Sequence, residues 1–151
     1  YVSLDKLIKQ IDYTKPKTIS CSYHFGKKEL NIIRKTFKRL RIGIAVNPEN
    51  FNINYLKSIK DIVNVIYYDL NVYKTKSIKK YSLEKNLDQI NWIKQLKIPI
   101  FIGGGINQSN VSKIINAVKP DGLDISRSLK NSKNILSSKK LNSFLSQISV
   151  A

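Results

Sequence analysis

Cysteine, methionine, histidine and tryptophan are almost absent from this chain of 151 residues, which has one Cys, no Met, one His and one Trp. A single cysteine, Cys21, excludes an internal disulfide and agrees with a reducing compartment. No group of Cys, His and Asp has the spacing of metal ligands, so we expect neither a metal nor a cofactor. Because Met is absent even from position 1, we expect the chain to be a segment of a longer protein.

Long hydrophobic runs are also absent, and none reaches the length of a transmembrane segment. The first residues, Tyr1-Val2-Ser3-Leu4-Asp5, have neither the charged start nor the apolar core of a signal peptide. We therefore expect a soluble, cytoplasmic protein with no membrane partner. The apolar share of 42% suits a folded globule, and the length predicts one domain over residues 1–151.

Acidic residues are scarce: 10 Asp and Glu stand against 27 Lys and Arg, for a formal net charge of +17. Such an excess is typical of nucleic-acid binding, because clustered cations neutralise phosphates. Here the excess is nearly all Lys, and the side chains able to form bidentate contacts are Arg34, Arg39, Arg41 and Arg127. The longest basic stretch, 27–41, carries apolar residues at helical spacing, so its cations form an outer face. We expect a solvated surface, with a non-catalytic basic fragment that binds nucleic acid as an alternative.

Helical and strand-like periodicities alternate along the sequence. Short apolar runs predict strands near residues 18–22, 41–46, 64–69, 98–102 and 122–125. Apolar residues at helical spacing precede the first run and follow every run, which gives the order α(βα)5. Strict alternation implies parallel strands with right-handed crossovers, hence a barrel or a doubly wound sheet. The one long connection is 70–86, where we expect a loop.

Two loops rich in glycine or hydroxyl groups follow the last two predicted strands. Gly103-Gly104-Gly105 closes one strand, and Ser126-Arg127-Ser128 follows the other. Both loops lie at carboxyl ends of parallel strands, where backbone N–H groups at glycine turns and helix N-termini bind anions. The pattern predicts a phosphate site, although a tight strand-to-helix turn would also explain the glycines.

Two carboxylates lie at the ends of predicted strands. Asp69 closes an otherwise apolar run, where burial would raise its pKa and let it donate a proton. An ordinary loop or N-cap role also explains this residue. Asp124 precedes the Ser-rich turn, where it would contact a polar group of a substrate or pair with a Lys. Cys21 and His24 end the first strand, but no spacing rule supports them as a nucleophile and base.

The last third of the chain resembles phosphoribosylanthranilate isomerase, a (β/α)8-barrel enzyme of tryptophan biosynthesis. The segment 98–111 is similar to the family's strand 7 and phosphate loop, PIILAGGLNPENV, and 118–128 is similar to VKPYGVDVSSG. The segment 65–69 resembles the end of strand 6, YFLLD, which carries the general acid, and Trp92 stands where the family has the Trp of FDW. The resemblance implies an α/β fold of the (β/α)8 type, incomplete, in which residues 1–151 supply about five βα units, strands 4 to 8, as its C-terminal portion.

The resemblance also implies the chemistry, an Amadori rearrangement of N-(5'-phosphoribosyl)anthranilate to 1-(o-carboxyphenylamino)-1-deoxyribulose 5-phosphate. Asp69 would be the general acid that opens the ribose, and Asp124 would contact the anthranilate side. The phosphate would be held by Gly104, Gly105, Ser126, Arg127 and Ser128.

Three features depart from the family pattern. The family's catalytic Cys, in a Lys-Ile-Cys-Gly strand, has no counterpart here, and Cys21 is not its equivalent. The family's Gly-Gly-Thr-Gly loop after the acid is replaced by a Lys-rich stretch, and Ser128 stands where Gly is usual. The base therefore comes from a missing N-terminal part, or activity is impaired.

The nearest rival is ribulose-phosphate 3-epimerase, another phosphosugar barrel, which the segment 43–48 favours. That family needs an Asp before its paired glycines, where this chain has Ile102-Gly103. We therefore expect an isomerase that takes a small phosphosugar. Fusion to, or association with, another enzyme of the tryptophan pathway is a further expectation.

Overall fold

The computed structural model describes residues 2–74, 77–80 and 83–148. Its centre is a five-stranded sheet of order β1-β2-β3-β6-β7, in which all neighbouring strands are parallel. The strands are β1 (Thr18–Ser22), β2 (Arg41–Val46), β3 (Val65–Asp69), β6 (Ile100–Gly103) and β7 (Gly122–Leu123). The helices are α1 (Leu4–Thr14), α2 (Lys27–Thr36), α3 (Ile53–Ile59), α4 (Leu83–Gln95), α5 (Val111–Val118) and α6 (Ser138–Ile148), with a short 3-10 helix, η1 (Arg127–Leu129).

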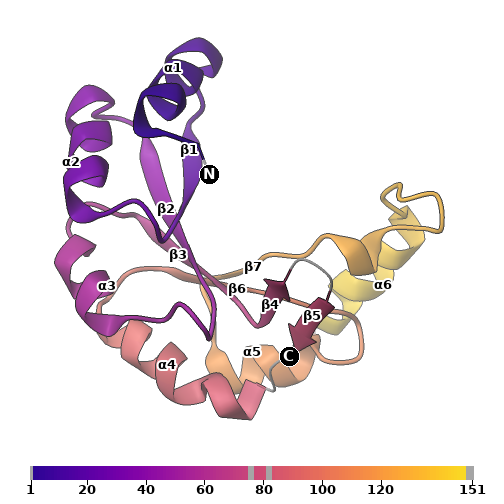
Figure 1. Ribbon diagram of the computed structural model, residues 1–151. Coiled ribbons are helices and arrows are strands. Elements are labelled where there is room, and N and C mark those ends of the chain that lie inside the picture. The colour runs from indigo at the N-terminus through magenta and orange to yellow at the C-terminus, as the bar shows by residue number, and fades with distance from the viewer. Residues whose placement is uncertain (1, 75–76, 81–82, 149–151) are drawn as a thin grey trace.

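The sheet is open, because β1 and β7 each have one neighbour. Helices α2 to α5 form an arc along one side of the sheet, with α1 at one end and α6 at the other (Figure 1). Five parallel strands alternating with helices confirm the predicted α/β fold, and the open sheet agrees with an incomplete barrel.

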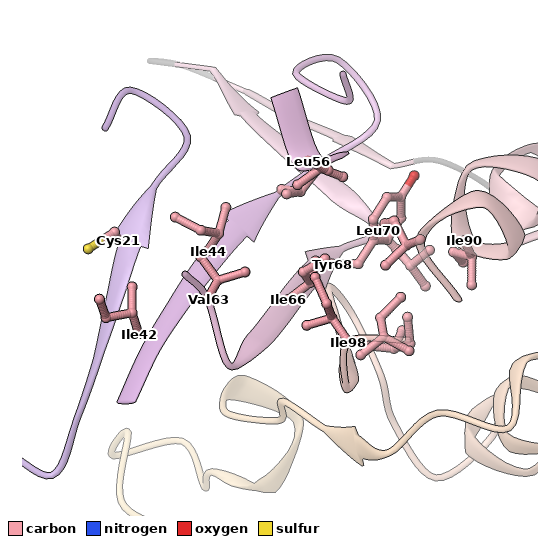
Figure 2. Packing of buried hydrophobic residues seen from close by; sticks show 14 of the residues in the cluster. Cys21, Ile42, Ile44, Leu56, Val63, Ile66, Tyr68, Leu70, Ile90 and Ile98 are labelled. Atoms are coloured by element: carbon pink, nitrogen blue, oxygen red, sulfur yellow. The ribbon is translucent and has the colours of Figure 1, made fainter. Parts of the chain in front are cut away.

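The core lies between the sheet and this arc of helices. Alternate residues of the central strands, such as Ile44, Ile66 and Ile102, are fully buried. They join one cluster with apolar residues of the helices, including Leu56 of α3 and Ile90 of α4 (Figure 2). On the other face of the sheet, Tyr67 and Phe101 meet edge to face, with ring centroids 5.6 Å apart.

The stretch 70–86, predicted as a loop, contains regular structure instead. Asn71–Lys74 (β4) and Ser77–Lys80 (β5) pair as an antiparallel hairpin, and α4 begins at Leu83. Pairing the two segments satisfies backbone groups that an irregular loop would leave to water. The prediction was therefore wrong here, because period-2 alternation over four residues is too short to separate a strand from a loop.

Two predicted strands also have different boundaries in the structure. The strand predicted at 98–102 begins at Ile100, after Pro99, and β7 contains two residues instead of four. As an edge strand, β7 pairs with β6 alone, and its last backbone bond runs from Asp124 N to Ile102 O at 2.8 Å. The helix that follows β6 begins at Val111. Among the described residues, no helix is long and apolar enough to cross a membrane.

Candidate functional site

The carboxyl ends of β3, β6 and β7 surround a cavity of about 460 Å³. All seven residues singled out in the sequence line it: Asp69, Gly104, Gly105, Asp124, Ser126, Arg127 and Ser128. Parallel strands place their carboxyl ends at one edge of the sheet, which explains why residues far apart in sequence converge here. The structure therefore brings the predicted acid and both predicted phosphate loops into one cavity.

Asp69 is the last residue of β3 and is half-buried. Burial raises the pKa of its carboxyl group, and the nearby Asp124 carboxylate raises it further. The backbone N–H of Asn71, which donates to Asp69 Oδ1 at 2.8 Å, and the charge of Arg127 act in the opposite direction. The net effect raises the pKa, so Asp69 keeps its proton to a higher pH than an ordinary Asp, as a general acid requires.

The glycine loop after β6 has a backbone that favours glycine. Gly104 and Gly105 have φ angles of +91° and +81°. A Cβ at position 104 would lie 2.5 Å from Leu70 N and 2.8 Å from Asn71 N. The loop is therefore more than a sharp corner, because it packs directly against the chain that follows Asp69.

Side-chain amides hold this loop in one shape. The carbonyl oxygen of Gly105 accepts hydrogen bonds from Asn107 Nδ2 at 3.2 Å and from Asn110 Nδ2 at 3.1 Å. The backbone N–H of Asn107 donates to Asn110 Oδ1 at 2.8 Å, and Asn107 Oδ1 accepts from Ser109 N at 2.8 Å. These bonds fix the turn between β6 and α5 before any ligand binds.

The second loop is tied to the first by Ser128. Its hydroxyl donates to the carbonyl oxygen of Ile106 at 2.6 Å. The bond links η1 to the glycine loop and occupies the Ser128 hydroxyl proton. Contact between Ser128 and an anion would therefore come from its backbone N–H.

Cys21 and His24 lie outside the cavity. Cys21 is 3% exposed on β1, and burial raises the pKa of its thiol to about 11, so it stays a neutral thiol. The ring of His24 packs edge to face on Tyr23, with centroids 4.4 Å apart. The two residues do not form a catalytic pair in the cavity, in agreement with the sequence analysis. Among the described residues, no group of three His, Cys, Asp or Glu side chains could hold a metal ion.

The sequence analysis missed two polar residues that line the cavity, Asn71 and Asn107. Asn71 is 4% exposed, and its Nδ2 would lie 3.4 Å from a Cβ at Gly105. Asn71 lies in the stretch 70–86, which the sequence predicts as a loop, so no burial is expected there. For Asn107, the signal is the sequence Asn107-Gln108-Ser109-Asn110, whose side chains are typical of turns before a helix.

Sequence comparison identifies relatives of one kind. An N-(5'-phosphoribosyl)anthranilate isomerase of Methanococcus voltae is 47% identical over 47 residues, which are 30% of this chain and 70% of the relative. The chain belongs to the N-(5'-phosphoribosyl)anthranilate isomerase family. A longer family member, from Leptospira borgpetersenii, is 34% identical over 58 residues, and the match spans 38% of this chain but only 27% of that relative. No protein-family model matches.

Solved structures give the fold. N-(5'-phosphoribosyl)anthranilate isomerases of Pyrococcus furiosus and Thermococcus kodakaraensis superpose with TM-scores of 0.73 and 0.75, at 19% and 16% identity. They cover all of this chain, which covers 71% and 72% of theirs. KGPDC of Streptococcus mutans superposes equally well, with a TM-score of 0.75 at 12% identity over 99% of this chain and 68% of its own. Proteins with another name therefore share this fold, so the fold by itself does not identify the family. The family assignment rests on the relatives found by sequence.

Proposed function

We propose that the protein takes part in the isomerisation of N-(5'-phosphoribosyl)anthranilate in the cytoplasm, with Asp69 as the general acid. One observation carries the proposal. A half-buried carboxyl group with a raised pKa shares a cavity of about 460 Å³ with a positive-φ glycine loop and a Ser-Arg-Ser turn. The cavity volume falls in the range of small-molecule sites, roughly 300–1,000 Å³.

The first step of the reaction is ring opening. Asp69 donates its proton to the ribose ring oxygen while the bond between this oxygen and C1 breaks, and the amino nitrogen forms a Schiff base with C1. A base then removes the proton from C2, and the resulting enolamine becomes the ketone. Asp69 suits the first step because burial raises the pKa of its carboxyl group.

Binding is divided between two parts of the cavity. The phosphate fits the backbone N–H groups of Gly104, Gly105 and the turn 126–128, with Arg127 adding a charge-assisted contact. Asp124 lies beside Asp69 and is assigned to the anthranilate side. Cys21 is excluded as the base for C2, because it is buried outside the cavity.

The test compares Asp69→Asn with Asp88→Asn, which removes an exposed carboxylate on α4. The assay uses the full-length protein, and turnover is measured as the loss of substrate fluorescence. We expect Asp69→Asn to lower the rate by a factor of about 10²–10⁴, the usual effect of losing one positioned acid. Binding of a reduced, unreactive analogue of the product, measured by calorimetry, should change little, because the phosphate loops are untouched. Near-normal kcat/KM in Asp69→Asn would overturn the assignment.

A further inference from the structure

A second concave site lies at the opposite end of the sheet from the candidate site. It is a groove of about 700 Å³ at the amino ends of β1 and β2, beside the carboxyl ends of α1 and α2. None of its lining residues is shared with the cavity around Asp69. A ligand in the groove would therefore not compete directly with a substrate in that cavity.

The floor of the groove is apolar and is held in place by the backbone. Ile11 and Leu40 are 3% and 5% exposed, and Pro16 and Phe37 are half-buried. The N–H of Arg41 donates to Lys17 O at 3.0 Å, and the N–H of Leu40 donates to Phe37 O at 3.1 Å. These bonds join the two connections that form the groove, so its shape does not depend on flexible side chains alone.

The rim of the groove is positive. Five cations line it: Lys15, Lys17, Lys38, Arg39 and Arg41. Lys15 pairs with Asp12, whereas in the described part of the chain no acidic side chain forms an ion pair with the other four. The ends of α1 and α2 each contribute about half a negative charge, which offsets only part of this excess.

The rim of the groove is rich in arginine, whereas the rest of the chain's positive charge comes mainly from lysine. The chain has four arginines, and two of them, Arg39 and Arg41, line the groove. Arg34 is structural, since its guanidinium donates to Ile62 O at 2.6 Å and to Asn64 Oδ1 at 2.7 Å. The guanidinium group binds carboxylates and phosphates through two parallel hydrogen bonds.

We propose that this groove binds a small amphipathic anion, an organic carboxylate or phosphate monoester with an aromatic or short aliphatic body. The apolar floor takes the body, and the four uncompensated cations take the head group. The volume of about 700 Å³ suits a molecule of this size. A nucleic acid fits less well, because its backbone follows an extended basic track, whereas these cations surround an apolar floor.

The probe for the test is 2-naphthoate, titrated by calorimetry in a phosphate-free buffer into the wild-type protein and two variants. The groove variant is Lys38→Gln/Arg39→Gln/Arg41→Gln. The matched control, Lys27→Gln/Lys28→Gln/Lys35→Gln, removes the same charge from exposed positions of α2 outside the groove. All six side chains are exposed, so both variants should fold, which circular dichroism checks.

We expect the groove variant to lose about tenfold in affinity for 2-naphthoate, while the control changes little. Both 2-naphthamide, which lacks the charge, and acetate, which lacks the aromatic ring, should bind more weakly than 2-naphthoate. Equal losses in both variants, or none in either, would overturn the proposal. It would also be overturned if a short single-stranded oligonucleotide displaced the probe and its own binding required the same three cations.

Discussion

The carboxylate of Asp69 occupies the space that a side chain at position 104 would need. A Cβ built on Gly104 would collide with Asp69 Oδ1 and with the backbone N–H groups of the two residues that follow Asp69. The glycine in the predicted phosphate loop therefore also gives room to the predicted acid. The predicted acid and the predicted phosphate loop are therefore sterically coupled.

A first prediction follows for Gly104→Ala. The new methyl group must displace Asp69 in addition to straining a backbone with φ of +91°, so we expect a loss of about 1–3 kcal/mol in stability and weaker phosphate binding. Gly105→Ala is the matched control, because its φ is +81° but its Cβ would meet nothing closer than 3.4 Å. Urea unfolding and phosphate calorimetry measure both effects. Equal behaviour of the two variants would show that Asp69 and Gly104 are independent.

The raised pKa of Asp69 makes stability depend on pH in a defined direction. Above the ordinary Asp pKa of about 3.9, the folded state binds more protons at this residue than the unfolded state, so its contribution to stability falls as pH rises through the raised value. Asp69→Asn removes this titration. We therefore expect the variant to be more stable than the wild type near pH 7, with a smaller difference below the ordinary pKa.

Denaturant unfolding at both pH values measures this effect, with Asp88→Asn as the exposed control. If Asp69→Asn were destabilised more at neutral pH than at low pH, the carboxylate would be favoured in its charged form. The assigned direction of the pKa shift would then be wrong.

The charges around Asp69 predict opposite shifts of the pH profile. The Asp124 carboxylate raises the pKa of Asp69, and Arg127 lowers it. An acid catalyst must be protonated, so turnover should fall as pH rises through the Asp69 pKa. We expect Asp124→Asn to move this fall to lower pH and Arg127→Gln to move it to higher pH. The midpoint of kcat/KM against pH is the readout, because both variants also lower the rate itself. Shifts in the same direction would contradict the arrangement.

The buried hydroxyl of Tyr68 contributes to stability, and we expect its removal to lower stability without affecting phosphate binding. The hydroxyl of Tyr68, which is fully buried, lies 2.7 Å from Gln89 Oε1 and 3.0 Å from Asn86 Oδ1 of α4. Tyr68→Phe removes this donor and should cost about 1–3 kcal/mol, with phosphate binding unchanged. Tyr67→Phe, on the opposite face of the sheet, is the control and should cost less. Thermal unfolding compares the two, and equal losses would show that the contacts with α4 contribute little.

The sequence was sufficient for the alternation of parallel strands and helices along the chain and for seven of the residues that line the candidate site. Alternating periodicities identified all five parallel strands, because hydrophobic burial on one side of a sheet leaves a local pattern. Glycine, serine, arginine and aspartate at or after the ends of these strands pointed to those seven residues, since parallel strands place their carboxyl ends together. The resemblance to the isomerase family supplied the chemical roles that remain proposals.

Only the tertiary structure decided what those residues contact. The collision between a side chain at 104 and Asp69 depends on the register of β3 and β6, which pairs Asp69 with Gly103. Burial of Asn71 and the basic groove between α1 and α2 depend in the same way on segments that meet across the sheet. A sequence pattern records which residues are apolar or flexible along one segment. Contacts between distant segments come from packing, which sets distances that no local pattern contains.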